Sequence, residues 1–329
     1  MKTSTFDHLK FSVCIPTYKR GPDLFYTIKS VVEQSYPHWE LNILDDSPDD
    51  DTLSLVNQFN NKKINYFKNS ERLGLVRNWN QCLKSAQNGY CMILHHDDFL
   101  LKDALLIYKR FIDNFPEAKF IHANAYIANL PFGRQVILIP KKKKIVLKEG
   151  DEGILDIMFR YGITCSTVVM HTSIFNKIGY YDEDCWVSPD WEYSARIAKH
   201  FKTYFIENPT AVYVYHYNNT HTSGYDVNIF ADQSRYHYQK VKGYLSNPHA
   251  GEISNDDGLL DAIKGLAVMM FIDGKYSKSI KFFMYSWKRV TVKTLIYTLV
   301  KRAIMISKLI FFKRTSYKEL FEKNFVKVS

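Results

Sequence analysis

Residues 11–44 read FSVCIPTYKRGPDLFYTIKSVVEQSYPHWELNIL and predict one strand–helix–strand unit. The apolar run Phe11–Pro16 ends at a proline, which indicates a buried strand that leads into a loop at Thr17-Tyr18-Lys19-Arg20. From Asp23 to Gln34 the apolar residues recur at helical spacing, which predicts a helix. Leu41–Leu44 is a second short apolar run, and it ends at Asp45-Asp46.

The same alternation of strand and helix continues to residue 125. Further strands are expected at Ile64–Phe67, Tyr90–Leu94 and Phe120–Ala125, and helices near Thr52–Phe59, Leu75–Ala86 and Asp103–Asn114. This order predicts an α/β fold with a mostly parallel sheet flanked by helices on both faces. Ligands of such sheets bind at the carboxyl ends of the strands.

The middle of the chain is less regular, and its end is expected to be helical. We expect helices at 153–161, 174–178 and 190–200, strands at 164–171 and 211–217, and helical structure from about residue 227 onward. The four lysines at 141–144 are expected in a solvated turn or hairpin. We therefore predict a main domain at 1–225, with halves at about 10–125 and 126–225, and a helical C-terminal region at 226–329.

The net charge of +10 lies mostly in the C-terminal region. Residues 260–329 hold fifteen Lys or Arg and four Asp or Glu, so the rest of the chain is close to neutral. From residue 278 to 314 the basic residues mix with bulky aliphatic and aromatic ones, which favours a helix on an anionic membrane surface over a nucleic-acid-binding module. A helical cap on the main domain with a solvated basic face is the alternative.

Cysteine spacing and the lack of long apolar segments favour a cytoplasmic protein on the inner face of the membrane. The five cysteines are widely spaced without a Cys-x-x-Cys motif, which indicates a reducing compartment. The first ten residues lack the apolar core of a signal peptide, and we expect no membrane-spanning segment. Dehydrogenase and ATPase motifs are absent from the sequence, which disfavours both of those classes.

An acidic cluster, His95-His96-Asp97-Asp98, follows the strand expected at Tyr90–Leu94. Adjacent carboxylates repel each other and require a compensating cation or hydrogen bonds. Mg²⁺ and Mn²⁺ prefer oxygen ligands together with phosphate, so these residues are candidate ligands of a metal that also holds a diphosphate. The alternative is a solvated turn, in which Asp is common.

Two further carboxylates lie at positions suited to substrate contacts. Asp46 follows a strand and can accept hydrogen bonds from a nucleobase or a ribose, unless it only caps a helix or turn. Asp190 lies at an expected helix N-terminus, where the dipole favours the ionised form that a general base requires. The alternative is a capping role for Asp190, with Glu192 exposed in the first helical turn.

Together these residues resemble the family 2 glycosyltransferases, which have the GT-A fold. The resemblance covers roughly residues 10–222 and rests on motifs in the family's order. They are Ser12–Tyr18 (SVCIPTY), Ser30–Tyr36 (SVVEQSY), Ile43–Ser47 (ILDDS), Gly74–Asn78 (GLVRN), His96-Asp97-Asp98 and Pro189–Glu192 (PDWE). Several spaced motifs in the right order are more specific than any one of them.

The resemblance implies a role for each matching residue. Pro16, Thr17 and Tyr18 would line the nucleobase pocket, Asp46 would accept from the base N–H, Arg77 would lie near the donor, Asp97 would touch the ribose or sugar, Asp98 would hold Mn²⁺ or Mg²⁺, and Asp190 would deprotonate the acceptor. His216 or His221 is a further candidate for a metal or diphosphate contact. The half at 10–125 would then bind the nucleotide sugar, and the half at 126–225 the acceptor.

The implied activity is inverting transfer of a sugar from a nucleotide sugar, with UDP as the expected nucleotide. The acceptor would be a hydroxyl of a glycan or a lipid-linked oligosaccharide in surface polysaccharide synthesis. Two departures from the family pattern stand out: His95 replaces the first carboxylate of the acidic motif, and Pro189 replaces the acidic neighbour of Asp190. They favour the alternative of a non-catalytic nucleotide- or sugar-binding protein of the same fold, whereas the four retained carboxylates favour an enzyme.

Overall fold

The structure is a computed structural model that describes residues 9–19, 22–87, 89–129, 134–137, 146–159, 163–215 and 227–246. The chain divides into two compact units. Among the described residues, the first unit includes 9–128 and most of 135–214, and the second includes helix α9 (Val227–Lys242). The lysines at 141–144, His216, His221 and the basic C-terminal region lie outside the described residues.

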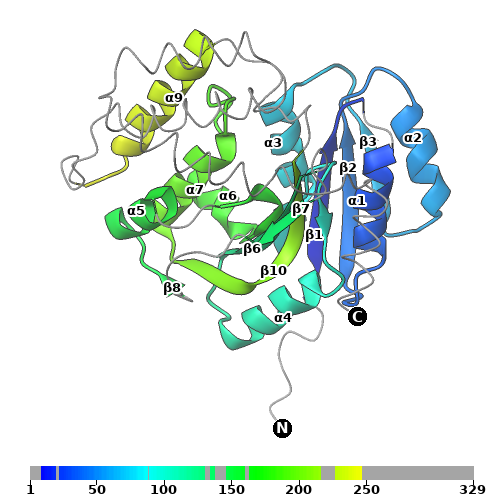
Figure 1. The fold of residues 1–329 in the computed structure, drawn as a ribbon, viewed down its shortest axis with the longest axis horizontal. Helices are drawn as coiled ribbons and strands as arrows, with labels where there is room; N and C mark the ends of the chain where they lie inside the picture. Colours follow the sequence, from blue (N-terminus) through cyan, green and yellow to red (C-terminus); the bar gives the residue numbers. More distant parts are fainter. Residues whose placement is uncertain are drawn as a thin grey trace. The chain divides into compact units, whose positions relative to one another are not determined.

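The first unit is built on a ten-stranded sheet (Figure 1). Its strands run in the order β3-β2-β1-β4-β9-β6-β10-β5, with β7 added beside β6 and β8 beside β10. Their bounds are β1 (Phe11–Thr17), β2 (Trp39–Asp45), β3 (Ile64–Lys68), β4 (Tyr90–Ile93), β5 (Phe99–Leu100), β6 (Phe120–Asn129), β7 (Arg134–Ile137), β8 (Val146–Leu147), β9 (Val168–His171) and β10 (Thr203–Tyr215).

The strands from β3 to β4 form the parallel part of the sheet. β1 pairs in parallel with both β2 and β4, and β2 pairs in parallel with β3. Beyond β4 the direction changes, because β9 is antiparallel to both β4 and β6, and β10 is antiparallel to β5 and β8. Four of the strands predicted in the first 125 residues form the parallel part, whereas the one expected at Phe120–Ala125 lies in β6 and pairs antiparallel with β9.

Helices cover both faces of the parallel strands. Their bounds in the first unit are α1 (Pro22–Val32), α2 (Asp51–Val56), α3 (Leu75–Ser85), α4 (Ala104–Asn114), α5 (Asp151–Phe159), α6 (Ser173–Ile178) and α7 (Pro189–His200), with short 3-10 turns η1 (Asn57–Phe59) and η2 (Cys165–Thr167). The helix α3 packs against β1, β2 and β4, and α1 packs against β5 and α2.

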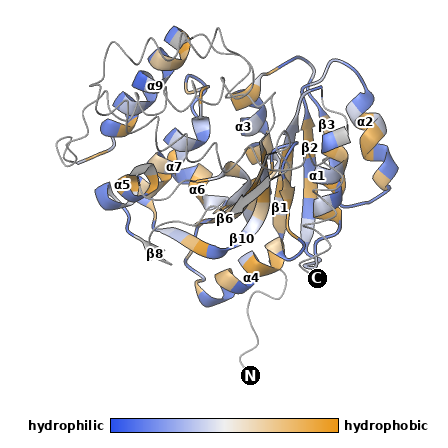
Figure 2. Ribbon diagram, viewed as in Figure 1, coloured by the Kyte–Doolittle hydropathy of each residue, from blue (hydrophilic) through white to orange (hydrophobic). Residues whose placement is uncertain are grey.

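Alternation along β1 explains why α1 and α3 lie on opposite faces. Val13 and Ile15 belong to the buried cluster that includes Leu24 of α1. Cys14, between them, points the other way, and its thiol donates to the carbonyl of Cys82 in α3 over 3.3 Å. Successive side chains of a strand face opposite sides of a sheet. Much of β1 is orange in Figure 2, because most of its own residues are apolar, and every residue of the strand is buried.

Three parts of the structure differ from the secondary structure that the sequence predicts. The strand expected at 164–171 begins only at Val168, and the residues before it form the turn η2. The strand expected at 211–217 is the end of a longer strand that begins at Thr203. The short strands β5, β7 and β8 have no counterpart in the prediction. Within the described ranges, none of the helices combines the length and the hydropathy that a membrane crossing requires.

Candidate functional site

The predicted polar clusters follow β1, β2 and β4 at one edge of the sheet. The strand register pairs Thr17 of β1 with Asp45 of β2. Just beyond the strands, the Asp46 N–H donates to the Thr17 carbonyl over 2.9 Å, and the Leu94 N–H donates to the Cys14 carbonyl over 2.9 Å. The loops that begin at residues 18, 46 and 95 therefore start side by side, where parallel sheets bind their ligands.

His95, Asp97 and Asp98 form a compact group of candidate metal ligands. One ligand atom from each lies within 4.8 Å of the others. Nδ1 of His95 lies 3.6 Å from Oδ2 of Asp98. Carboxylate oxygens suit both Mg²⁺ and Mn²⁺, and an added imidazole suits a transition metal such as Mn²⁺. The donor set therefore fits a divalent cation.

Asp98 is the enclosed member of this group. Its side chain is 0% exposed, and the Val214 N–H donates to its Oδ1 over 2.8 Å while the Ser166 hydroxyl donates to its Oδ2 over 2.5 Å. Burial first, and then the charge of Asp97, raise the pKa of Asp98 well above its usual range, and the two hydrogen bonds act in the opposite direction. A divalent cation would favour the charged form of both carboxylates, which gives a physical reason to expect one here.

The backbone of the acidic loop is anchored to α1 and to β1. The hydroxyl of Thr27, a fully buried residue, lies 2.9 Å from the carbonyl of His96 and 2.8 Å from that of Asp98. Nδ1 of His96 lies 3.1 Å from the carbonyl of Pro16. These contacts fix the course of the loop before any ligand binds.

His95 occupies the position at which the resemblance described above predicts a carboxylate. Its ring lies 5.1 Å from the ring of Trp79, which in turn lies 5.3 Å from the ring of Tyr181. The imidazole is thus held between an aromatic side chain and Asp98. A neutral imidazole is a common metal ligand, so this replacement changes the charge of the group without removing a donor atom.

Asp46 is buried and already holds the loop before α3. Its Oδ1 accepts from the Leu73 N–H over 2.7 Å and from the Asn69 amide over 3.1 Å, and its Oδ2 accepts from the Gly74 N–H over 2.8 Å. Gly74 has a φ of 82°, a left-handed value that favours glycine. Asp46 therefore supports the wall of the predicted nucleobase pocket, and its Oδ2, which accepts one of these bonds, keeps a second lone pair for a contact with the base.

Tyr18 and Thr17 lie at the end of β1, as predicted for that pocket. The guanidinium of Arg72 lies 4.2 Å from the centre of the Tyr18 ring, a cation–π contact with the loop that Asp46 holds. Thr17 is 2% exposed, and its hydroxyl has no hydrogen-bond partner among the described residues. A buried hydroxyl without a partner is uncommon in folded proteins and marks a position where a ligand can supply one.

Arg77 of α3, which the sequence predicts near the donor, forms an ion pair with Glu183. Its Nε lies 2.8 Å from Oε2 of Glu183, and more than half of each side chain is exposed. In the next turn of α3, the Asn80 side chain donates to the carbonyl of Tyr181 and accepts from its N–H. The segment around residues 181–183 is therefore fixed to α3 at two points.

Asp190 lies in the first turn of α7, as the sequence predicts. The turn begins at Ser188, whose φ of 56° is left-handed. The pKa of the Cys165 thiol is well above its usual value, mainly because the thiol is buried. The negative charges of Asp190 and then of Asp98 raise this pKa further. The charges of the two predicted acidic sites thus act on the same buried thiol.

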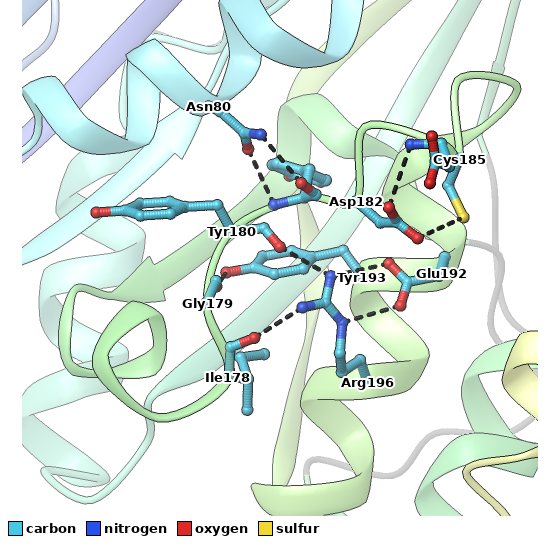
Figure 3. Close-up of polar contacts among 11 residues, drawn as sticks. Asn80, Ile178, Gly179, Tyr180, Asp182, Cys185, Glu192, Tyr193 and Arg196 are labelled. Atoms are coloured by element: carbon cyan, nitrogen blue, oxygen red, sulfur yellow. Dashed lines mark hydrogen bonds and ion pairs between the residues drawn. The ribbon is translucent and has the colours of Figure 1, made fainter.

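The alternative in which Glu192 is exposed is wrong, because Glu192 is fully buried and paired. Its two carboxylate oxygens accept hydrogen bonds from Nε and Nη2 of Arg196, each over 2.9 Å (Figure 3). Arg196 also donates to the carbonyls of Ile178 and Tyr180, so it ties the preceding turn to α7. Removing one partner of a buried ion pair typically costs about 3–5 kcal/mol. Glu192 therefore supports the helix that carries Asp190.

Several residues that support the site are missed by sequence reasoning. Thr27 and Ser166 contact the acidic loop but lie 71 and 68 residues away from Asp98 in the chain. Nothing in their local sequence marks them. The pair Glu192–Arg196 had a usable signal, since opposite charges four residues apart on a helix commonly form an ion pair.

Comparison with known proteins gives matches for most of the described chain. Residues 12–144 match the family model for glycosyl transferase family 2. The chain is 31% identical over 131 residues to the putative teichuronic acid biosynthesis glycosyltransferase TuaG of Bacillus subtilis. The aligned region covers 34% of this chain and 52% of TuaG. It is 28% identical over 170 residues to the UDP-Glc:alpha-D-GlcNAc-diphosphoundecaprenol beta-1,3-glucosyltransferase WfaP of Escherichia coli, covering 51% of this chain and 63% of WfaP. Each match leaves more than a third of the relative without a counterpart.

The fold has counterparts among solved structures. The crystal structure of residues 1–349 of Staphylococcus aureus TarS in complex with UDP-GlcNAc aligns with a TM-score of 0.57 at 17% identity, covering 87% of this chain and 77% of that one. At this level of identity the likeness concerns the fold alone. It confirms the GT-A fold that the sequence predicts.

Proposed function

We propose that this chain, whose residues 12–144 belong to glycosyl transferase family 2, transfers a sugar from a nucleotide-sugar donor to an acceptor hydroxyl. The observation that carries the proposal is the convergence at one sheet edge of Thr17, Asp46 and the group His95, Asp97 and Asp98. This arrangement suits a ligand with a nucleoside at one end and a diphosphate at the other. We propose a UDP-sugar as the donor, supported by the UDP-Glc that the name of WfaP includes and by the UDP-GlcNAc in the TarS complex.

The nucleoside would lie against β1 and the loop after β2. Pro16, Thr17 and Tyr18 would line its pocket, and the unpartnered hydroxyl of Thr17 offers one hydrogen bond. Asp46 would accept from the base N–H through a remaining lone pair. Arg77 would contact the donor after exchanging its exposed ion pair with Glu183, because an exposed pair is worth only about 0–1 kcal/mol.

His95, Asp97 and Asp98 would hold Mn²⁺ or Mg²⁺, which when bound neutralises the leaving diphosphate. Asp98, predicted as the metal ligand, has both oxygens occupied by protein donors, although each oxygen has a further lone pair. As a whole residue, Asp97 is less buried than Asp98. We propose His216 or His221 as a further metal or diphosphate contact, as the sequence predicts; both lie outside the described residues.

Asp190 would take the proton of the acceptor hydroxyl. The acceptor oxygen forms a bond to the anomeric carbon on the face opposite the diphosphate, whose own bond to that carbon breaks. The proton passes to Asp190 and the diphosphate leaves with the bonding electrons. A single displacement of this kind inverts the anomeric configuration. We propose a glycan or a lipid-linked oligosaccharide as the acceptor, in surface polysaccharide synthesis.

A panel of nucleotide sugars tests the proposed activity. We expect hydrolysis of at least one UDP-sugar, detected as release of UDP, in the presence of Mn²⁺ or Mg²⁺ and a fall to background in excess EDTA. GDP- and CMP-sugars serve as controls for nucleotide selectivity. Binding of a nucleotide sugar without any turnover, in every metal and with pooled glycan acceptors, would instead support the non-catalytic alternative.

We also propose that the basic region after residue 226 brings the protein to the inner face of the cytoplasmic membrane. The proposal rests on its sequence, because residues 247–329 lie outside the described structure. We expect the full chain to float with vesicles that contain anionic phospholipid at low salt and to stay unbound with neutral vesicles, because charge drives such binding. Equal recovery with both kinds of vesicle would contradict an electrostatic attachment.

A further inference from the structure

Ser166 lies at the junction between the acidic loop and the turn η2. Ser166 is fully buried, with 0% of its surface exposed. The hydroxyl oxygen accepts from the His95 N–H over 3.3 Å and donates to Oδ2 of Asp98 over 2.5 Å. One buried hydroxyl therefore contacts two of the three candidate metal ligands, through the backbone of one and the side chain of the other.

The bond from Ser166 determines how the Asp98 carboxylate is oriented. Two donors fix a carboxylate, and the second one here is the Val214 N–H on Oδ1. That N–H belongs to the backbone of β10, whereas the Ser166 hydroxyl is a side-chain group. Without the Ser166 hydroxyl, Oδ2 of Asp98 would lack its donor from η2 in a fully buried site. The carboxylate could then turn about its Cβ–Cγ bond.

The turn η2 is itself held firmly, so it can transmit a fixed position to the loop. The Thr167 N–H and the Thr167 hydroxyl both donate to the carbonyl of Thr164, over 2.9 Å and 2.8 Å. The Tyr108 hydroxyl donates to the carbonyl of Thr167 over 2.6 Å. Three hydrogen bonds independent of the acidic loop therefore set where the Ser166 hydroxyl lies.

We propose that Ser166 is a positioning residue for the metal-binding group, and that it holds Asp98 and the start of the loop at His95 in the geometry that a divalent cation requires. The proposal rests on the function proposed above. Groups that orient metal ligands through hydrogen bonds typically change metal affinity or activity about 10–100-fold when they are removed. Ser166 is expected to act through Asp98 and His95 without touching the sugar or the metal.

The test is the affinity of the full chain for Mn²⁺ in the presence of UDP, measured from the loss of the free-Mn²⁺ spin-resonance signal and corrected for UDP alone. We expect Ser166→Ala to raise the Kd about 10–100-fold. Ser12→Ala is the matched control, because it removes a buried serine hydroxyl that bonds to Glu40 at the start of β1, the end of that strand opposite to the acidic loop. It should lower the thermal midpoint by a similar amount and leave the Kd for Mn²⁺ unchanged.

Two outcomes would overturn the proposal, and they are distinguishable. Equal Mn²⁺ affinities for Ser166→Ala and the wild-type chain would remove the role of Ser166 while leaving the metal site intact. Failure of the wild-type chain itself to bind Mn²⁺ would remove the metal site and with it the reason for a positioning residue. Ser166→Cys covers the case in which the alanine variant does not fold: its weaker thiol donor should give an intermediate Kd, and a wild-type Kd would count against the proposal.

Discussion

Replacing Asp190 with Asn should reduce sugar transfer about 10²–10⁴-fold while leaving donor binding nearly unchanged, because the amide cannot take a proton from the acceptor. Transfer is measured by product formation with a responsive donor and acceptor pair. Donor affinity is measured separately, by calorimetry with UDP and Mn²⁺. The loss should fall on kcat, with little change in the KM for the donor.

The structure explains why the effect should be confined to the proton transfer. Asp190 lies in the first turn of α7, where the helix dipole stabilises a negative charge. The helix is anchored independently, because the buried pair of Glu192 and Arg196 and the bonds of Arg196 to two carbonyls hold it in place. An Asp190→Asn side chain is nearly isosteric with the original, so the fold around it should persist.

Asp184→Asn is the matched control for Asp190→Asn. Asp184 is an exposed carboxylate six residues earlier, in the segment that precedes α7. Its removal changes the charge of the chain by the same amount and should leave transfer within about twofold, in line with the small effect of most surface substitutions. Near-normal turnover in Asp190→Asn would exclude a base role for Asp190. Loss of donor binding in that variant would indicate a structural role.

The parallel half of the fold follows directly from local sequence patterns. Strands β1 and β2 are short apolar runs such as Phe11–Pro16, and the intervening helix has a regular apolar face. Each element buries residues against its immediate neighbours in the chain, so local patterning is sufficient to predict it. The polar clusters then fall at the carboxyl edge, because parallel strands all end there.

The antiparallel half depends on contacts between distant segments, which a single sequence does not reveal. The segment at 164–171 (TCSTVVMH), predicted as one strand, has its apolar run only at Val168–Met170. Its first residues instead form η2, in which Ser166 bonds to Asp98. The preference of those residues for a turn therefore comes from a tertiary contact that outweighs local propensity.

Asp98→Asn and Asp97→Asn should both weaken Mn²⁺ binding strongly, and only Asp98→Asn should also destabilise the fold. The reason lies in their different surroundings. Asp98 is fully buried and accepts one hydrogen bond on each oxygen, from the Val214 N–H and the Ser166 hydroxyl. An amide at that position has a single acceptor oxygen, so one buried donor loses its partner, at a cost of about 1–3 kcal/mol.

The measurement combines a thermal or denaturant unfolding curve with the Kd for Mn²⁺ in the presence of UDP, for both variants and for Asp184→Asn as the charge control. We expect the free energy of unfolding of Asp98→Asn without metal to fall by about 1–3 kcal/mol. That of Asp97→Asn should fall less, because this change removes the negative charge that repels Asp98.

The two variants also separate the roles of the carboxylates at the metal. If Asp98 contributes a ligand oxygen, its loss should raise the Kd for Mn²⁺ at least as much as the loss of Asp97, beyond the 10–100-fold typical of a group that only orients ligands. A smaller effect for Asp98→Asn than for Asp97→Asn would assign the metal contact to Asp97 and leave Asp98 as its buried support. Unchanged Mn²⁺ affinity in both variants would contradict a metal site at this loop, because the charge repulsion between Asp97 and Asp98 would then be balanced by the protein's own hydrogen bonds alone.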